Sequence, residues 1–158
     1  MKKAKYSADK VAKYFIYLSN KEHRGISNKK LQKILYYSQA WNLVFNDGPL
    51  FQEDIEAWVH GPAVRSIYTK YKRFGFNSIP FTGKSDEFSN LQEKELLNEI
   101  WRVYGKFDGD YLEILTHEEW PWREARGELE GHALSDAVIS LETMKKFYSD
   151  KLKKSKNG

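Results

Sequence analysis

Four histidines are the residues of this chain best suited to acid–base chemistry. His23 lies in a charged turn and His132 follows a glycine, so both are expected to face solvent. His60 precedes a Gly-Pro pair, which favours a role in the turn or in binding over catalysis. His117 stands in the run Thr-His-Glu-Glu at 116–119, where pairing with a carboxylate and a hydrogen bond at a helix end explain it equally well. None of the four indicates a catalytic pair.

The other motifs that carry chemistry are incomplete or missing from the sequence. His117-Glu118 could begin a His-Glu-x-x-His zinc motif, but Pro121 occupies the position of the second histidine. There is no phosphate-binding P-loop, no dinucleotide-binding glycine motif and no Gly-x-Ser-x-Gly nucleophile elbow. Acidic pairs occur at 108 and 110 and at 118 and 119, but such pairs are common on protein surfaces. The sequence predicts neither an enzyme nor a metal or cofactor site.

The net charge of +4 and the pI near 9.0 come from the two ends of the chain. Three lysines lie within residues 2–5 and four within residues 151–156, and removing these seven leaves 19 basic against 22 acidic residues, a balance of −3. Basic residues interleaved with tyrosines at 65–73 keep nucleic-acid binding open as an alternative. The mildly acidic body opposes an extended basic groove.

Length and composition predict one cytoplasmic domain. The 158 residues suffice for a single core, and 24 aromatic residues are expected to dominate it. The absence of cysteine suits a reducing compartment. No apolar stretch has the length of a signal peptide or of a membrane span, so no membrane partner is expected. We expect one domain over 1–158 with a flexible lysine-rich tail at 151–158.

Apolar periodicity and capping residues predict the elements that would position these side chains. The expected fold is mainly α, a compact bundle of about six to seven helices with one small β element. The strand is expected near 52–60 and its partner near 77–81, because a lone strand leaves its backbone groups unpaired. Helices are expected over about 8–20, 27–46, 62–74, 89–104 and 111–115, from 121 onward, and from 135 to 152.

Several short motifs in this order resemble those of one known family. They are Leu-Gln-Lys-Ile-Leu-Tyr at 31–36, Gly-Pro-Leu at 48–50, Glu-Ala-Trp at 56–58, Gly-Pro-Ala-Val at 61–64, Tyr68, Tyr-Gly at 104–105 and Thr-His-Glu-Glu-Trp-Pro-Trp at 116–122. This set resembles the signature of the Panacea domain, the SocA-like antitoxin family that includes phage-associated GepA-type proteins. The resemblance implies a domain without cofactor or catalytic residue, which neutralises a toxin by direct contact.

Carried onto this chain, the resemblance implies two groups of residues. Most motif positions are expected to determine the fold: Leu31, Gln32, Lys33, Leu35, Tyr36, Pro49, Glu56, Ala57, Gly61, Pro62, Val64, Thr116, His117, Pro121 and Trp122. Candidates for binding a cognate toxin are Trp58, His60, Arg65, Tyr68, Lys72, Arg73 and Trp120, because Trp, Tyr and Arg carry much of the energy of protein interfaces. The alternatives are a nucleic-acid-binding regulator of its own operon and an adaptor that delivers a client protein. The oligomeric state stays open.

Overall fold

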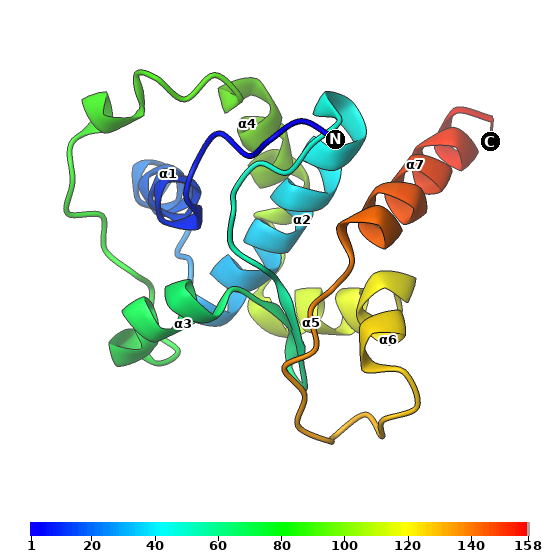
Figure 1. Ribbon diagram of the computed structural model, residues 1–158. Helices are drawn as coiled ribbons and strands as arrows, with labels where there is room; N and C mark the ends of the chain where they lie inside the picture. Colours follow the sequence, from blue (N-terminus) through cyan, green and yellow to red (C-terminus); the bar gives the residue numbers. More distant parts are fainter. Residues whose placement is uncertain (158) are drawn as a thin grey trace.

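A computed structural model describes residues 1–157, which form seven α-helices, two 3-10 turns and one small sheet (Figure 1). The elements are α1 (Ala8–Lys21), α2 (Asn28–Asn46), β1 (Glu56–Trp58), β2 (Gly61–Ala63), α3 (Arg65–Tyr71), η1 (Lys72–Phe74), η2 (Ser85–Phe88), α4 (Lys94–Tyr104), α5 (Gly109–His117), α6 (Trp120–Arg126) and α7 (Leu141–Asn157). The prediction of a mainly α fold with six to seven helices and a small β element is confirmed.

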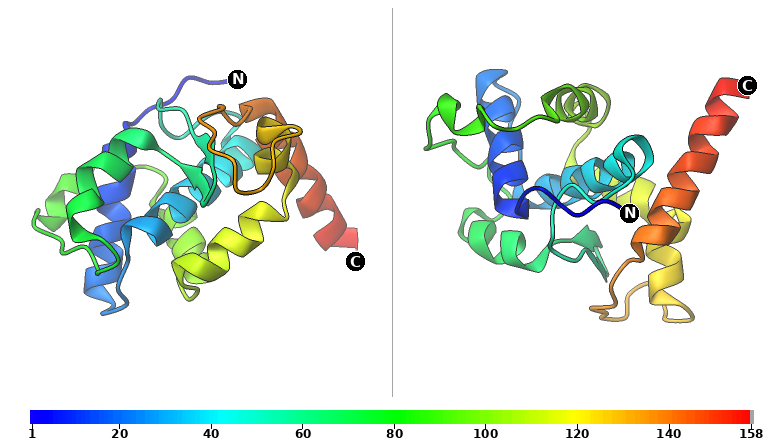
Figure 2. Two further views of the ribbon diagram at one scale, coloured as in Figure 1. Left: turned by 90° about the horizontal axis from the view of Figure 1, so that it is seen from below. Right: turned by 45° about the horizontal axis from the view of Figure 1, so that its top comes forward.

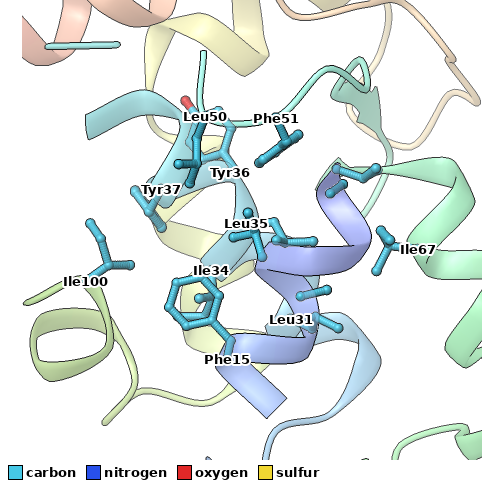
Figure 3. Close-up of a cluster of buried hydrophobic side chains, with 14 of the residues drawn as sticks. Phe15, Leu31, Ile34, Leu35, Tyr36, Tyr37, Leu50, Phe51, Ile67 and Ile100 are labelled. Atoms are coloured by element: carbon cyan, nitrogen blue, oxygen red, sulfur yellow. The ribbon is translucent and has the colours of Figure 1, made fainter. Parts of the chain in front are cut away.

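Helix α2 runs through the middle of the molecule and is surrounded by other elements (Figure 2). The Ser27 hydroxyl caps its first turn by accepting a hydrogen bond from the Lys30 N–H, and Asp47 ends it in the left-handed conformation. Every residue from 30 to 40 is buried. Figure 3 shows how its apolar side chains meet those of α1, α3, α4 and the 50–51 segment: Phe15, Leu31, Ile34, Leu35, Tyr36, Tyr37, Leu50, Phe51, Ile67 and Ile100.

Aromatic side chains join the lysine-rich α7 to α2. The buried hydroxyls of Tyr148 and Tyr36 lie 3.2 Å apart, and the ring of Tyr37 stacks on Tyr104 at 3.9 Å. The indole of Trp41 covers Tyr148 edge-on and donates a 3.0 Å hydrogen bond to the Tyr104 hydroxyl. Each buried ring removes a large apolar area from water, so these contacts hold a helix whose other side is charged.

Amide side chains of α2 bind the backbone of the irregular segment that follows it. The Oε1 atom of Gln39 accepts hydrogen bonds from the N–H groups of Leu50 and Phe51, and its Nε2 donates to the Phe51 carbonyl. Asn42 donates to the carbonyl of Gly48. These bonds satisfy buried backbone groups that no regular element pairs, so residues 48–51 fold back along α2.

The small sheet differs from the sequence prediction in its second strand. β1 pairs antiparallel with β2, and Glu56 lies opposite Ala63 and Trp58 opposite Gly61, so the partner is not 77–81. Gly61 has a φ of +104°, which permits the tight reversal at residues 59–60. The Ile79 N–H instead donates to the carbonyl of Ile26, so the 77–81 segment is anchored to the α1–α2 connection.

Three predicted helix starts are also wrong. Pro62 lies in β2, and α3 begins only at Arg65; α4 begins at Lys94 rather than near 89. The last helix begins at Leu141 rather than at 135, because the preceding residues run beside β1. There the Ala57 N–H donates to Ala137, and the Ile139 N–H donates to Ile55. At the other end, α7 continues as a helix to Asn157.

We predict that Gln39→Leu lowers the free energy of unfolding by about 3 kcal/mol, because it leaves two buried N–H groups and one carbonyl unpaired. Urea denaturation measures this change. The matched control is Gln52→Leu at an exposed position, which should change the free energy by less than about 0.5 kcal/mol. Equal unfolding midpoints for Gln39→Leu and the wild type would contradict the anchoring role of this amide.

Candidate protein-binding surface

The tip of the hairpin and the start of α3 form an aromatic and charged cluster, here called the Trp58 cluster: Glu56, Trp58, Arg65 and Tyr68. The indole N–H of Trp58 donates to Glu56 Oε1 at 2.9 Å, and Arg65 Nη2 lies 2.7 Å from the same oxygen. The ring of Tyr68 meets Trp58 edge-to-face at 5.0 Å. Because α3 begins two residues after β2 ends, Arg65 and Tyr68, one turn apart, both reach the Trp58 ring.

Electrostatics fix the geometry of this cluster. Burial alone would raise the pKa of Glu56, but the hydrogen bonds from Arg65 and Trp58 and the charge of Arg65 lower it. The carboxylate therefore stays ionised and keeps the guanidinium 5.1 Å from the indole centroid. The side chains are held together before any partner arrives, so binding would not have to order them.

A shallow hollow of about 510 Å³ adjoins the Trp58 cluster. Trp58 and Val59 of the hairpin and Arg65 of α3 line one side, and residues 134–136 line the other. Leu134 is 89% exposed there, which is unusual for a large apolar side chain beside a hollow. The cluster and the hollow together have the aromatic and apolar character of a protein-binding site.

Four other predicted binding residues do not belong to this cluster. His60 is exposed, and its Nδ1 lies 3.5 Å from Glu113 of α5. Lys72 and Arg73 lie in η1 beyond the far end of α3, where the Arg73 guanidinium covers Phe74. Trp120 is 52% exposed at the first turn of α6. Trp122 is two positions further along the chain, or about 200° around a helix, so the two indoles point to opposite sides.

The motif at residues 116–122 packs against the hairpin and fixes β1. The Trp122 indole N–H donates to the carbonyl of Trp58 at 2.8 Å, and the ring of His117 stacks on Trp122 at 4.0 Å. Burial lowers the pKa of His117, which favours the neutral imidazole. Thr116 hydrogen-bonds to the carbonyls one turn before it and is buried. These residues hold β1 in place.

The motif at residues 31–36 fixes β2 through side chains that bond to its backbone. Gln32 Oε1 accepts a 2.8 Å hydrogen bond from the Val64 N–H, and Lys33 Nζ donates to the Pro62 carbonyl at 3.3 Å. Gly61 lies so close to Lys33 Cε that an added Cβ would stand 2.6 Å from it. Most of the expected fold determinants are buried in this way: Leu31, Gln32, Lys33, Leu35, Tyr36, Ala57, Gly61, Pro62, Val64, Thr116, Pro121 and Trp122; Pro49, Glu56 and His117 are partly buried.

Sequence reasoning missed two buried charges that shape this region. Arg126 of α6 donates hydrogen bonds to the carbonyls of Ala57, Glu130 and Ala133, and so ties residues 130–133 to the sheet. Glu119 accepts a 2.8 Å hydrogen bond from the Tyr37 hydroxyl and pairs with Lys151 of α7. Charged residues are mostly exposed in folded proteins, so the sequence contained no sign that Glu119 and Arg126 are buried.

The described residues contain no assembled metal or membrane site. Across residues 1–157, no three His, Asp or Glu side chains come close enough together to hold a metal ion. None of the helices in that range has the length and apolarity that crossing a bilayer requires. The geometry defines the class as a mainly helical domain that presents an aromatic and charged surface.

Comparison with known proteins agrees with this class. The model of the antitoxin SocA-like, Panacea domain family matches residues 31–123, and this match includes the motif positions from Leu31 to Trp122. Because more than half of the chain is matched, the chain belongs to this family of antitoxin domains. No match is found among curated proteins or among solved structures. Membership of an antitoxin family indicates a non-catalytic role.

Burial of Lys33 predicts an unusual dependence of stability on pH. Burial lowers its pKa to about 7, whereas an unfolded lysine titrates near 10.4. Between these values the unfolded chain holds a proton that the folded chain has released, so the free energy of unfolding should rise with pH, by roughly 1 kcal/mol per unit. Lys30, whose pKa burial lowers to about 8, adds in the same direction.

We predict that Lys33→Met flattens this rise between pH 7 and 9, because the neutral side chain has no proton to release on folding. Urea denaturation at several pH values measures the slope. Lys154→Met, an exposed position near the end of α7, is the control and should keep the wild-type slope. An unchanged slope in Lys33→Met would show that the Lys33 amine is not desolvated in the folded protein.

Proposed function

We propose that this chain is the antitoxin of a toxin–antitoxin pair and neutralises its cognate toxin by direct binding through the Trp58 cluster and the adjoining hollow. The observation that carries the proposal is the division of the family motif. Its scaffold residues are buried around α2, whereas the motif residues Trp58 and Tyr68 meet Arg65 at the surface in a preformed arrangement. Such a surface supports recognition by complementarity of shape and charge.

Binding of this kind would neutralise the toxin by covering its active surface. No catalytic group on the antitoxin is required, which agrees with histidines that are stacked, solvent-facing or in a turn. The acidic balance of the body between residues 6 and 150 suits a basic toxin, such as one that acts on RNA. Toxin and antitoxin would meet in the cytoplasm.

Operon regulation through nucleic-acid binding has weaker support. Two of the basic residues that suggested it are already paired with carboxylates, Arg65 with Glu56 and Lys70 with Asp9. Tyr71 is buried and not available to stack on a base.

Co-expression tests the proposed function. A product of a neighbouring open reading frame should arrest growth when expressed alone and should be neutralised by this chain, and the two proteins should copurify. The proposal fails if no neighbouring product is both toxic alone and rescued by this chain.

The surface is tested with Trp58→Ala, which we expect to weaken binding to the neutralised toxin by about 30-fold, the effect typical of a central aromatic contact. Calorimetric titration measures the affinity, and thermal unfolding shows whether the variant is folded. Phe76→Ala is the matched control, because this aromatic is 92% exposed and lies beyond η1, outside the surface. Equal affinities for Trp58→Ala and the wild type would exclude the Trp58 cluster from the interface.

A further inference from the structure

The segment before α7 forms the outer edge of the small sheet. Val138 lies opposite Glu56 in an isolated antiparallel bridge, flanked by the hydrogen bonds from Ala57 N–H to the Ala137 carbonyl and from Ile139 N–H to the Ile55 carbonyl. In this type of pair the N–H and C=O groups of Val138 point away from β1. Within residues 1–157 neither group has a hydrogen-bond partner. The sheet therefore ends in an open edge.

Two side chains along this edge, Leu134 and Val138, are apolar and exposed. Val138 is 52% exposed, and Leu134 lines the hollow beside Trp58 and Arg65. An open edge beside exposed apolar side chains invites pairing with another strand, and proteins usually protect such edges with lysine, proline or a covering element. Residues 134–138 contain neither lysine nor proline, and Asp136 is their one charged residue.

The loop that leads to the edge is acidic. Between residues 127 and 140 there are three acidic residues, Glu128, Glu130 and Asp136, and neither lysine nor arginine. All three are exposed. The buried Arg126 fixes the start of this loop through the carbonyls of Glu130 and Ala133, so the acidic groups stand on an anchored backbone.

We propose that the 134–138 edge receives an extended segment of the protein partner, which adds a strand to the sheet beside Val138 and places an apolar side chain in the hollow next to Trp58. Charge complementarity identifies the occupant as a segment with alternating apolar and basic residues. The inference rests on the proposed function, because it specifies how the toxin is held. Main-chain hydrogen bonds supply affinity, and the hollow and the acidic loop supply specificity.

A second copy of this chain fits the edge less well. Two identical edges would bring Asp136 and the neighbouring glutamates of both copies together, and like charges at close range oppose association. A basic strand instead gains from the same charges.

The first arm of the experiment needs no toxin. The blocked peptide acetyl-Lys-Val-Lys-Leu-Lys-Val-amide is titrated into the 15N-labelled full chain, and backbone amide shifts are followed. We expect shifts centred on residues 134–138 and Trp58, and none with the matched peptide in which glutamate replaces lysine. The absence of shifts at 134–138 with the basic peptide, or equal shifts with both peptides, would overturn the proposal.

The second arm uses the toxin that the chain neutralises. Val138→Pro removes the outward N–H without touching the bonds to β1, and we expect at least tenfold weaker binding; Val138→Ala keeps the N–H and should change affinity by less than threefold. If Val138→Pro fails to fold, Leu134→Asp tests the same edge at an exposed position. Wild-type affinity in the folded edge variant would overturn the edge proposal while leaving the antitoxin function intact.

The two arms separate the two ideas. If no neighbouring product is neutralised, the proposed function fails, and the peptide titration alone decides whether the edge accepts a strand. Analytical sedimentation of the free chain tests whether a second copy of the chain occupies the edge. A concentration-dependent dimer that disappears in Val138→Pro would assign the edge to a second copy and overturn the assignment to a partner strand.

Discussion

Hydrogen bonds from buried polar side chains of α2 to the backbone of irregular segments are the interaction on which the rest of this structure depends. Gln39 holds residues 50–51, Gln32 and Lys33 hold the second strand of the hairpin, and Lys30 reaches the Gly105 carbonyl. An apolar α2 would still attract the other helices, but the backbone of these segments would be buried without partners. The helix is therefore both the centre of the apolar core and the anchor of the loops.

This arrangement separates the scaffold from the recognition surface. The hairpin is fixed by α2 on one side and by Trp122 and Arg126 of α6 on the other. The groups that fix it are mostly side chains acting on backbone atoms, so they do not depend on which side chains the hairpin exposes. The hydrogen bonds that fix the hairpin therefore do not involve the side chains of Trp58 and Arg65.

Sequence patterns predicted what depends on local periodicity and failed where tertiary contacts decide. Ser27 and the apolar stripe located α2 correctly, because capping and helical spacing are local signals. Pro62 was assigned to a helix start, although in this chain the two-residue reversal before Gly61 places it in β2. The Trp58 cluster was anticipated as candidate residues, but not as one cluster. Neither Arg126 nor the edge at Val138 could be foreseen, since their roles come from elements that lie far apart in the sequence.

Buried backbone groups of the loops are paired with side chains in this fold, whereas the outward backbone groups of Val138 are not. A chain that uses Gln39, Asn42, Gln32 and Arg126 to satisfy buried loop carbonyls and amides leaves the outward groups of Val138 to water. Water can satisfy them, so the edge costs the free protein little. A partner strand could replace that water without rearranging the sheet, because the bonds to β1 already hold residues 137–139 beside it. Binding by strand addition needs a backbone that is fixed on one side and has unpaired N–H and C=O groups on the other, and Val138 meets both conditions.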